Sequence, residues 1–462
     1  MQKNVLWSLR LGFSAQQSVQ IQKLGFNTFI SQSLSSSIAP KMPAFLRDEP
    51  HTLADLKNLR QEIKNADEKE QKKILKKQIY NHFQLKKWWL QSIRTSEWPL
   101  REKMVVFWHN HFVSSAQKVK VNYWIYQHYT VLYENAFGNF KELTKKIIQT
   151  NAMVKYLDNV DNKKDNLNEN LSRELLELFT LGIGNYTELD VKNGAKALAG
   201  LNLGEDKAIY RKPLEVNETI EYLGKKGHFK VEELIDQIFE QPQIPYLITR
   251  KILQWFLYDQ PDEKLVQYYG DFFRTQNFEI KPLLLKIFTE EYEKDIQGRK
   301  IKDPLVYILQ LANELQLQPV SDEAILFFLR QQGMDLFNPP NVKGWEGGNS
   351  WLTSQTYLQR NKASDLWCQG KNLKFKGLKD SLEDIEIDVE TVNVQLNWNK
   401  KSKPNTIIQS FTDRLLFQVD ENMQQDLEQM LKYDFDPYSP NADEVIMRLF
   451  HFITQTPEFQ IL

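Results

Sequence analysis

Apolar residues recur at helical spacing through most of this chain, and long runs of strand-type alternation do not occur in it. Residues 51–96 are rich in Leu, Lys, Glu and Gln, and Leu53, Leu56 and Leu59 follow one another at three-residue steps. This segment predicts one or two long helices. The same periodicity returns further along the chain, so we expect a mostly α fold with a large, multi-helix, bundle-like body.

Prolines and capping residues divide the helical segments. Residues 230–259 predict two amphipathic helices that are separated at Pro242 and Pro245. Asp303 followed by Pro304 predicts another helix start, because proline lacks the amide hydrogen that would have no partner in a first helical turn.

Three parts are expected along the 462 residues. The main helical domain covers residues 1–365, and a C-terminal helical unit over residues 406–462 is packed on this main body. Between them, residues 366–405 predict a loop or a short strand pair, since Val392, Val394 and Leu396 alternate with other residues.

The charge of the chain is nearly balanced, with 59 Lys and Arg against 60 Asp and Glu. This balance does not favour a nucleic acid or an anionic membrane as an obligatory partner. The single cysteine, Cys368, allows no disulfide within the chain. The first 17 residues contain only short apolar pieces, so we expect no membrane span and a cytoplasmic protein.

The motif FWHNHF, residues 107–112, places two histidines among three aromatic residues. Ser96 and Pro99 predict the start of a helix that runs into this motif. On a continuous helix His109 and His111 would point about 200° apart, so they could not bind one ion together. The favoured interpretation is that the aromatic residues pack while one imidazole bonds to a buried carbonyl or carboxylate; a functional imidazole is the alternative.

Residues 168–200 predict two consecutive helices. Asn168 is expected to cap the first, which Gly182 would end, and Thr187 with Asp190 resembles a capping box for the second.

The first of these helices carries a group of acids. Arg173 lies four positions from both Glu169 and Glu177, which favours ion pairs along one face. Glu174 and Glu177, three positions apart, could instead hold a divalent metal with a histidine from elsewhere. The ion-pair interpretation is the favoured one because Arg173 lies beside the two acids.

The segment FNPPNVKGWEGGNSWL, residues 337–352, combines two prolines with three glycines and predicts a compact loop. Trp345 and Trp351 lie on this loop. They either pin the loop into the body, which is the commoner case, or stack on a sugar or a peptide.

Four segments together resemble the bacterial domain-of-unknown-function 1800 family. They are REKMVVFWHNHF, NAFGNF, VKYLDNVDNKKDNLNENLSRELLELFTLGIGNYT and PPNVKGWEGGNSWL. The resemblance runs in order from Arg10 to Gln460, and it is most specific around Glu169. It implies no particular reaction, and it implies relatives that are in many cases exported.

The chain departs from the family pattern at two places. Relatives often carry a histidine where this chain has Leu6, and a His-Asp pair with a lysine where it reads EVNETIEYLGKKGHF. If those groups belong to an active site, this chain is a degenerate member. The family's polar positions fall on His109, Asn110, His111, Asp158, Asn159, Asn168, Glu169, Asn170, Arg173, Glu174, Glu177, Asn185 and Tyr186.

Three functional hypotheses follow. The leading one is an assembly or partner-binding protein, in which a protein partner meets the tryptophan loop. The second is a metal-dependent hydrolase, in which His109 or His111 gathers with Glu174, Glu177 and Asp158 around a divalent metal ion that activates water. Its catalytic candidates are His109, His111 and Glu174, and its metal-ligand candidates are the same three residues and Glu177. The third is glycan binding through exposed, parallel Trp345 and Trp351 rings. The candidate binding residues are Asn110, Asp158, Asn170, Arg173, Trp345 and Trp351.

One structural hypothesis separates these functions. The helices that carry HNHF and NLSRELLELF should pack together, because each presents polar groups that need partners when they are buried.

Overall fold

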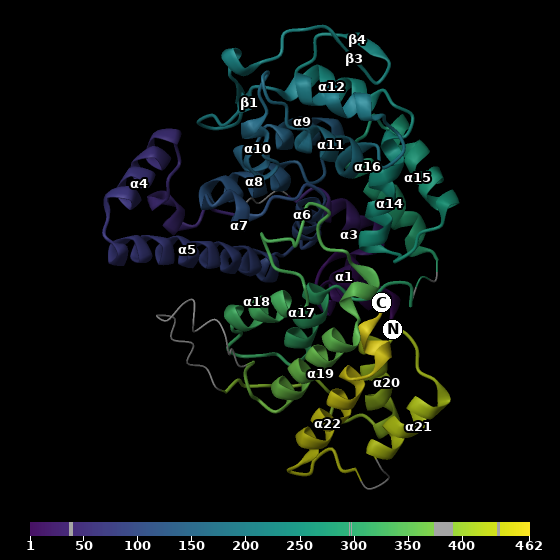
Figure 1. The fold of residues 1–462 in the computed structure, drawn as a ribbon. Helices are drawn as coiled ribbons and strands as arrows, with labels where there is room; N and C mark the ends of the chain where they lie inside the picture. The colour runs from purple at the N-terminus through teal and green to yellow at the C-terminus, as the bar shows by residue number, and fades with distance from the viewer. Residues whose placement is uncertain (37–39, 295, 297, 374–390, 432–434) are drawn as a thin grey trace.

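The computed structural model describes residues 1–36, 40–294, 296, 298–373, 391–431 and 435–462. Within these residues the chain forms 22 α-helices and two small antiparallel sheets of two strands each, so the prediction of a mostly α fold is confirmed (Figure 1). None of the helices in this described part is both long and apolar enough to cross a membrane.

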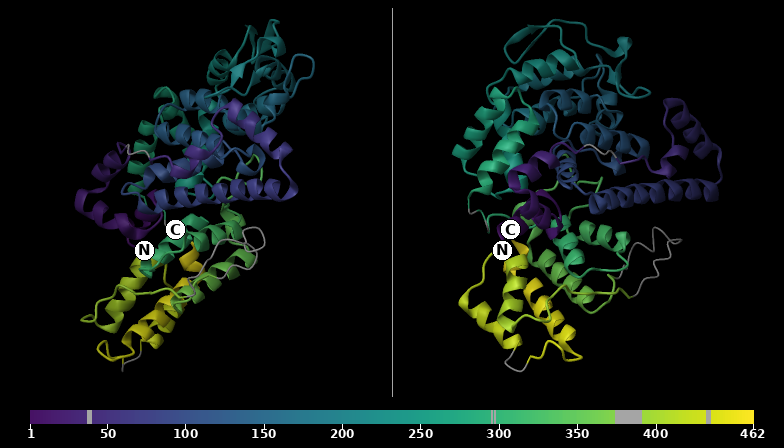
Figure 2. Two further views of the ribbon diagram at one scale, coloured as in Figure 1. Left: turned by 90° about the vertical axis from the view of Figure 1, so that its left-hand side faces the viewer. Right: turned by 180° about the vertical axis from the view of Figure 1, so that it is seen from behind.

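Helices α1–α3 and the long pair α4 and α5 come first in the chain. The pair projects from the rest of the molecule as an arm, which is visible from both sides (Figures 1 and 2). Residues 51–96 therefore form two helices, as their periodicity predicts. The bounds are α1 (Lys3–Leu11), α2 (Ser18–Leu24), α3 (Phe26–Ser33), α4 (Leu53–Asn65) and α5 (Glu68–Thr95).

The main body, α6–α16, occupies the upper part of Figure 1. Its helices are α6 (Leu100–His111), α7 (Ala116–Val119), α8 (Asn122–Glu134), α9 (Phe140–Ile148), α10 (Asn151–Tyr156), α11 (Asn170–Glu174), α12 (Glu188–Leu198), α13 (Val231–Phe239), α14 (Ile244–Phe256), α15 (Glu263–Thr275) and α16 (Ile280–Tyr292). The two hairpins pair β1 (Leu201–Asn202) with β2 (Ile209–Tyr210) and β3 (Ile220–Tyr222) with β4 (Lys225–Gly227).

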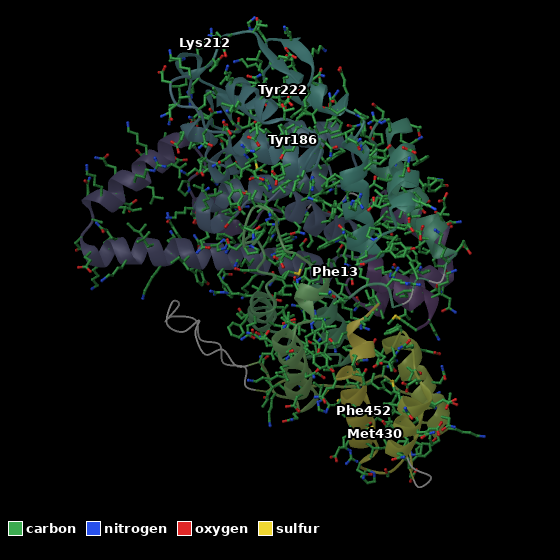
Figure 3. All side chains as sticks on the ribbon, turned by 45° about the vertical axis from the view of Figure 1, so that its right-hand side comes forward. Phe13, Tyr186, Lys212, Tyr222, Met430 and Phe452 are labelled. Atoms are coloured by element: carbon green, nitrogen blue, oxygen red, sulfur yellow. The ribbon has the colours of Figure 1, made fainter. Side chains whose placement is uncertain are left out.

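The remaining helices lie below the main body. They are α17 (Pro304–Glu314), α18 (Asp322–Gln331), α19 (Ser354–Cys368), α20 (Pro404–Leu415), α21 (Glu421–Met430) and α22 (Ala442–Thr454). Figure 3 shows Met430 and Phe452 at this end of the molecule, well away from Tyr186 in the main body. The two chain ends lie side by side (Figure 1).

The C-terminal helices are joined to the preceding part of the chain by direct contacts. The Ser364 hydroxyl on α19 lies 2.6 Å from the Thr454 hydroxyl on α22. Residues 374–390 of the predicted loop or strand pair lie outside the described residues. Beside them, Lys371 pairs with Thr391 through one isolated bridge. The proposed division at 365 and 405 stays a prediction.

Local capping chemistry explains where several helices begin. The Asp303 side chain caps α17 by accepting a hydrogen bond from the Val306 amide at 2.9 Å. Thr187 and Asp190 form the expected capping box of α12. Helix α6 begins at Leu100, one residue after Pro99, which is its N-cap. Ser96 does not cap α6 and is instead the C-cap of α5.

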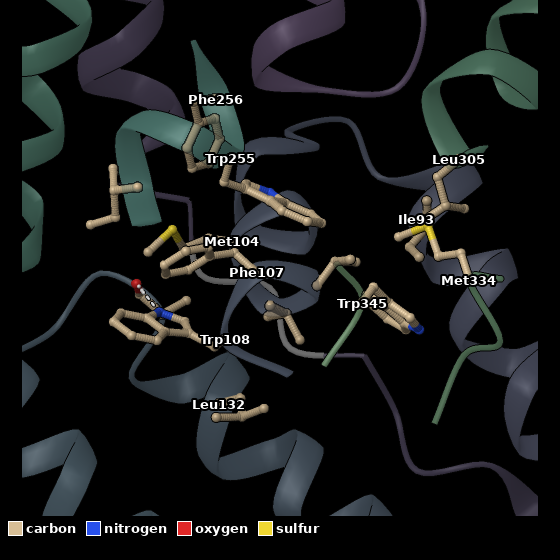
Figure 4. Close-up of a cluster of buried hydrophobic side chains, with 14 of the residues drawn as sticks. Ile93, Met104, Phe107, Trp108, Leu132, Trp255, Phe256, Leu305, Met334 and Trp345 are labelled. Carbon is tan, nitrogen blue, oxygen red and sulfur yellow. Dashed lines mark hydrogen bonds between the residues drawn. The ribbon is translucent and has the colours of Figure 1, made fainter. Parts of the chain in front are cut away.

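Buried aromatic rings surround α6. Phe107 and Trp108 of this helix are 3% and 0% exposed, and Figure 4 shows Phe107 beside Trp255 of α14, with the ring centroids 6.2 Å apart. The Trp108 indole donates to the Ala136 carbonyl at 3.0 Å, so its polar edge is satisfied inside the core.

A buried ion pair anchors the start of α6. The Lys103 ammonium lies 3.0 Å from an Asp303 carboxylate oxygen and donates to the Gly12 carbonyl at 3.1 Å. Burial is the main cause that lowers the pKa of Lys103, while Lys103 and the Val306 amide outweigh burial and lower the pKa of Asp303. One ammonium therefore joins the end of α1, the start of α6 and the cap of α17.

Replacing Lys103 with methionine should lower the free energy of unfolding by about 3–5 kcal/mol, because Asp303 would remain buried without its counter-ion. Urea denaturation monitored by circular dichroism measures the change. Lys72→Met, which removes an exposed ion pair with Glu68 on the arm, is the matched control and should change the stability little. An equal loss in both variants would contradict the anchoring role.

Candidate functional site

Helix α6 is continuous to His111 and separates the two histidines, as the helical geometry predicts. His109 is 1% exposed, and its ring lies 5.2 Å from Trp89, 5.5 Å from Phe337 and 5.9 Å from Trp345 between centroids. Within the described residues neither ring nitrogen of His109 has a hydrogen-bond partner. His109 is therefore packed among aromatic rings.

His111 faces the segment that follows α11. Its Nε2 lies 3.0 Å from the Phe179 carbonyl, and its Nδ1 lies 3.2 Å from Lys251 Nζ on α14. A carbonyl only accepts, so the proton is assigned to Nε2 and Nδ1 is left as an acceptor. These contacts confirm that HNHF packs against NLSRELLELF, and that one imidazole bonds to a buried carbonyl.

A π-helical segment, Leu175–Thr180, continues α11 and supplies that carbonyl. The Leu181 amide donates to the Leu176 carbonyl at 2.9 Å, five positions back, which is the π register. The Leu178 and Phe179 carbonyls near the end of the segment accept from Lys251 and His111. Periodicity in the sequence predicts an α-helix here and did not reveal the π register.

The acids of this segment divide between two environments. Arg173 pairs with Glu169 at 2.9 Å, as the spacing favours, and with Glu188 at 2.8 Å. Glu177 accepts instead from the Tyr186 hydroxyl at 2.8 Å. Burial first, and then the charge of Glu177, raise the pKa of the partly buried Glu174.

The predicted metal ligands do not form one group. In the described part of the chain, no three His, Cys, Asp or Glu side chains are placed so that they could hold a metal ion. His109 lies among aromatic rings, and both nitrogens of His111 are engaged. We therefore assign none of His109, His111, Glu174 or Glu177 as a metal ligand.

The tryptophan loop is fixed to the end of α6. Asn110 donates to the Trp345 carbonyl at 3.3 Å and accepts from the Trp345 amide at 2.5 Å. Trp345 and Trp351 are each 3% exposed, and Trp351 packs edge-on against Trp255 at 6.3 Å. The loop is thus pinned by its tryptophans, and the exposed, parallel pair required for glycan stacking is not formed by these two rings.

Gly344 allows this close approach of the loop to α6. Its φ is +84°, and a Cβ there would overlap the Asn110 side-chain oxygen and lie 2.5 Å from the Asn110 carbonyl oxygen. Any other residue at this position therefore meets both backbone strain and a steric clash.

A cleft of about 260 Å³ lies between the end of α6, α14 and the tryptophan loop. We name it the Trp-loop cleft. Phe107 and Trp255 contribute aromatic walls, and the charged residues Asp259 and Glu346 also line it. The polar residues and tryptophans on which the argument below depends are Asn110, His111, Lys251, Lys300, Trp345 and Trp351.

The other candidate binding residues lie away from the lining of this cleft. Asp158 pairs with Lys118 at 2.7 Å. Asn170 is exposed and opens α11, where its amide donates to the Asn168 side chain at 2.9 Å. Arg173 forms the ion pairs described above. The structure thus brings together Asn110, Trp345 and Trp351, and not Asp158, Asn170 or Arg173.

Two lysines of the cleft were not among the residues that the sequence singled out. Burial lowers the pKa of Lys251 to about 8. Burial likewise lowers the pKa of Lys300 to about 8, although Asp259 and Asp303 act in the opposite direction. The sequence does contain a signal for the first: Lys251 falls between Ile248 and Trp255 on the apolar face of α14, where a lysine is unusual.

Replacing Gly344 with alanine should lower the free energy of unfolding by about 2 kcal/mol, because the loop must move away from Asn110. Chemical denaturation monitored by tryptophan fluorescence measures it. Gly184→Ala is the matched control, since Gly184 has a φ of +85° and a Cβ added there would meet nothing within 4 Å. The clash interpretation requires that Gly344→Ala be the more damaging of the two.

Four imidazoles with lowered pKa values should make stability depend on pH. Burial lowers the pKa of His82 and of His109 to about 3 and that of His128 to about 4, and burial with the Lys251 charge lowers the pKa of His111 well below 6.5. Below pH 6.5 these histidines are protonated in the unfolded chain but stay neutral in the folded chain. The free energy of unfolding should therefore fall as the pH falls, by about 1.4 kcal/mol per pH unit for each histidine.

Denaturant titrations between pH 7 and pH 5 measure this slope. His109→Phe, which keeps a ring among its aromatic neighbours, should reduce the slope by about one proton. His228→Asn, at an exposed histidine, should leave it unchanged. A slope that is the same in all three proteins would show that His109 is not buried as a neutral ring.

Comparison with known proteins gave a match to a family model alone: no curated protein and no solved structure matched. The family model, described as a protein of unknown function (DUF1800), covers residues 5–461, which is nearly the whole chain. The motif segments FWHNHF and KGWEGGNSW, which lie far apart in the sequence, meet at the Trp-loop cleft. By this match over almost its full length, the chain belongs to the DUF1800 family.

Proposed function

We propose that this DUF1800 protein is a binding protein that holds an anionic group, a carboxylate or a phosphate, of a ligand or partner in the Trp-loop cleft. The observation that carries the proposal is the environment of Lys251. Its ammonium contacts the His111 ring and the Leu178 carbonyl, which are neutral groups, and no carboxylate among the described residues forms an ion pair with it.

A partly buried ammonium without a counter-ion is unfavourable, because its charge loses hydration that no partner replaces, and this burial lowers the pKa of Lys251 to about 8. An anion in the cleft would supply the missing charge. The electrostatic stabilisation of an anion by Lys251 is large in this cleft, because the attraction between opposite charges strengthens where water is excluded.

The other charges of the cleft support the same ligand class. Lys300 donates to the Gln254 carbonyl at 3.0 Å and has Asp259 no closer than 3.9 Å. Lys343 is a third cation on the lining. The two acids are already engaged: Asp259 accepts from the Ile301 amide at 2.9 Å, and Glu346 accepts from the Ser350 hydroxyl at 2.8 Å.

This proposal develops the partner-binding hypothesis and sets the other two aside. The hydrolase hypothesis required the histidines and glutamates to gather around one ion, and among the described residues they lie in separate environments. The glycan hypothesis required exposed tryptophan faces, and both rings are 3% exposed. A protein partner with an exposed acidic terminus or side chain would satisfy the cleft as well as a free ligand would.

Phosphate and malonate, tested separately at pH 7.5 against chloride at equal ionic strength, should raise the melting temperature of the native protein. Lys251→Met should weaken the binding measured by calorimetry by about tenfold or more, because the central ammonium is lost. Lys264→Met, at an exposed lysine on α15, is the control and should bind as the native protein does.

Equal binding by native protein and Lys251→Met would overturn the proposal. The two ligands also distinguish the two anionic groups: a response to malonate alone indicates a carboxylate site, and a response to phosphate alone indicates a phosphate site.

A further inference from the structure

We propose that Lys251 is a carbonyl-reactive amine, which forms an imine with a small 2-oxo carboxylate held in the Trp-loop cleft. This inference rests on the proposed anion binding, since the carboxylate of the ligand is what brings its ketone to the lysine. His111 is a positioning residue for the amine and does not itself touch the ligand carbon.

The contacts of Lys251 arrange its nitrogen for this chemistry. Nζ lies 3.0 Å from the Leu178 carbonyl and 3.2 Å from His111 Nδ1, and both atoms are acceptors. A tetrahedral amine nitrogen has three directions besides its bond to carbon, and each is taken by a hydrogen or by the lone pair. Two are directed to these acceptors, so the third, which holds the lone pair when the amine is neutral, is left for the cleft that Lys251 lines.

The acceptor character of His111 is itself fixed by the fold. The Phe179 carbonyl at the end of the π-helical segment holds the proton on Nε2, which keeps Nδ1 free to accept from the amine. This is the arrangement of a nucleophile, a neighbouring ring and a third group that orients the ring. The pKa of His111 is too low for it to be an effective base, so its role here is orientation.

We assign the carboxylate of the ligand to Lys300, a second cation on the cleft lining. Lys300 donates to the carbonyl of Gln254, which follows Lys251 by three positions, about one turn of α14. The ketone and the carboxylate of a 2-oxo acid are on adjacent carbons, so a ligand of this class carries a group for each of the two lysines that line the cleft. The cleft volume, about 260 Å³, suits such a small molecule.

The reaction is balanced without any oxidant or cofactor. The neutral Nζ adds to the ketone carbon and forms the C–N bond, and one N–H proton moves to the former carbonyl oxygen to give a carbinolamine. The C–O bond then breaks, and the hydroxyl leaves with the remaining N–H proton as water. The products are the imine and one water molecule.

Protonation favours Lys251 over the exposed lysines of the surface. The pKa of Lys300 is also lowered to about 8 by burial, but Lys300 has the Asp259 carboxylate at 3.9 Å to stabilise its charged form, whereas Lys251 has no such partner among the described residues. With a pKa of about 8, roughly a tenth of Lys251 is neutral at pH 7, which is on the order of a hundredfold more than for an ordinary lysine. The walls of Trp255 and Trp345 also limit the access of water to the imine.

Trapping with borohydride tests the inference. The full-length protein is incubated with pyruvate and sodium cyanoborohydride, and the reduced adduct is located by peptide mass spectrometry. We expect one adduct for each chain, at Lys251, with a rate that rises with pH and levels off near pH 8, whereas a surface lysine continues to gain reactivity toward about pH 10.

Two variants separate imine formation from anion binding. Lys251→Arg keeps a cation in the cleft but has no nucleophilic amine, so it should bind malonate and lose the adduct by at least about tenfold. Lys264→Arg, on the exposed face of α15, should form the adduct as the native protein does. His111→Leu should shift the pH profile of trapping, a change that a purely structural role would not produce.

The possible results distinguish the two proposals. No adduct at Lys251 in a protein that still binds malonate through Lys251 overturns the imine and leaves anion binding in place. Labelling spread evenly over exposed lysines, Lys264 included, also overturns the imine. If neither malonate nor phosphate binds and no adduct is found, both the imine and the proposed function fail.

Discussion

The buried ion pair between Lys103 and Asp303 is the interaction on which the rest of the site depends. It lies at the first turn of α6 and joins that helix to the Gly12 carbonyl and to the cap of α17. Eight residues further along, the same helix presents His111 to the π-helical segment. Because a helix transmits its orientation along its length, fixing the first turn of α6 also fixes the direction in which HNHF faces.

At its other end α6 is held by the tryptophan loop and not by charge. Asn110 bonds to both the amide and the carbonyl of Trp345, and Gly344 gives the space for this approach. The cleft therefore lies where the fixed end of α6 meets the tryptophan loop, and these two segments are more than 200 residues apart in the sequence. Side chains on such fixed elements are positioned more precisely than side chains on unattached loops.

Local signals predicted most of the helices, because each depends on neighbours only a few positions away. The capping box of Thr187 and Asp190 and the cap at Asp303 are of this kind. The hairpins β1–β2 and β3–β4 were not predicted, since strands of two or three residues are too short to show alternation. The π register at Leu175–Thr180 was also missed, because its apolar residues still fit an α-helical face.

The candidate site was predicted only in part, and for a related reason. The sequence indicated His111, Asn110 and the tryptophans, but the contact between His111 and Lys251 joins positions 140 residues apart. Only the fold decides which partner lies across from an imidazole. Lys251 could have been found as a lysine on the apolar face of α14, and that kind of signal does not depend on a motif.

The departures from the family pattern bear on this site in a specific way. Leu6 lies on α1 and is 2% exposed, and EVNETIEYLGKKGHF forms the β3–β4 hairpin and its flanks. Neither belongs to the residues that line the Trp-loop cleft. The hypothesis that this chain has lost family groups therefore concerns other parts of the molecule. The ammoniums of Lys251 and Lys300, with the ring of His111, are all present in this chain, so recognition of an anion in the cleft does not require the groups that are missing.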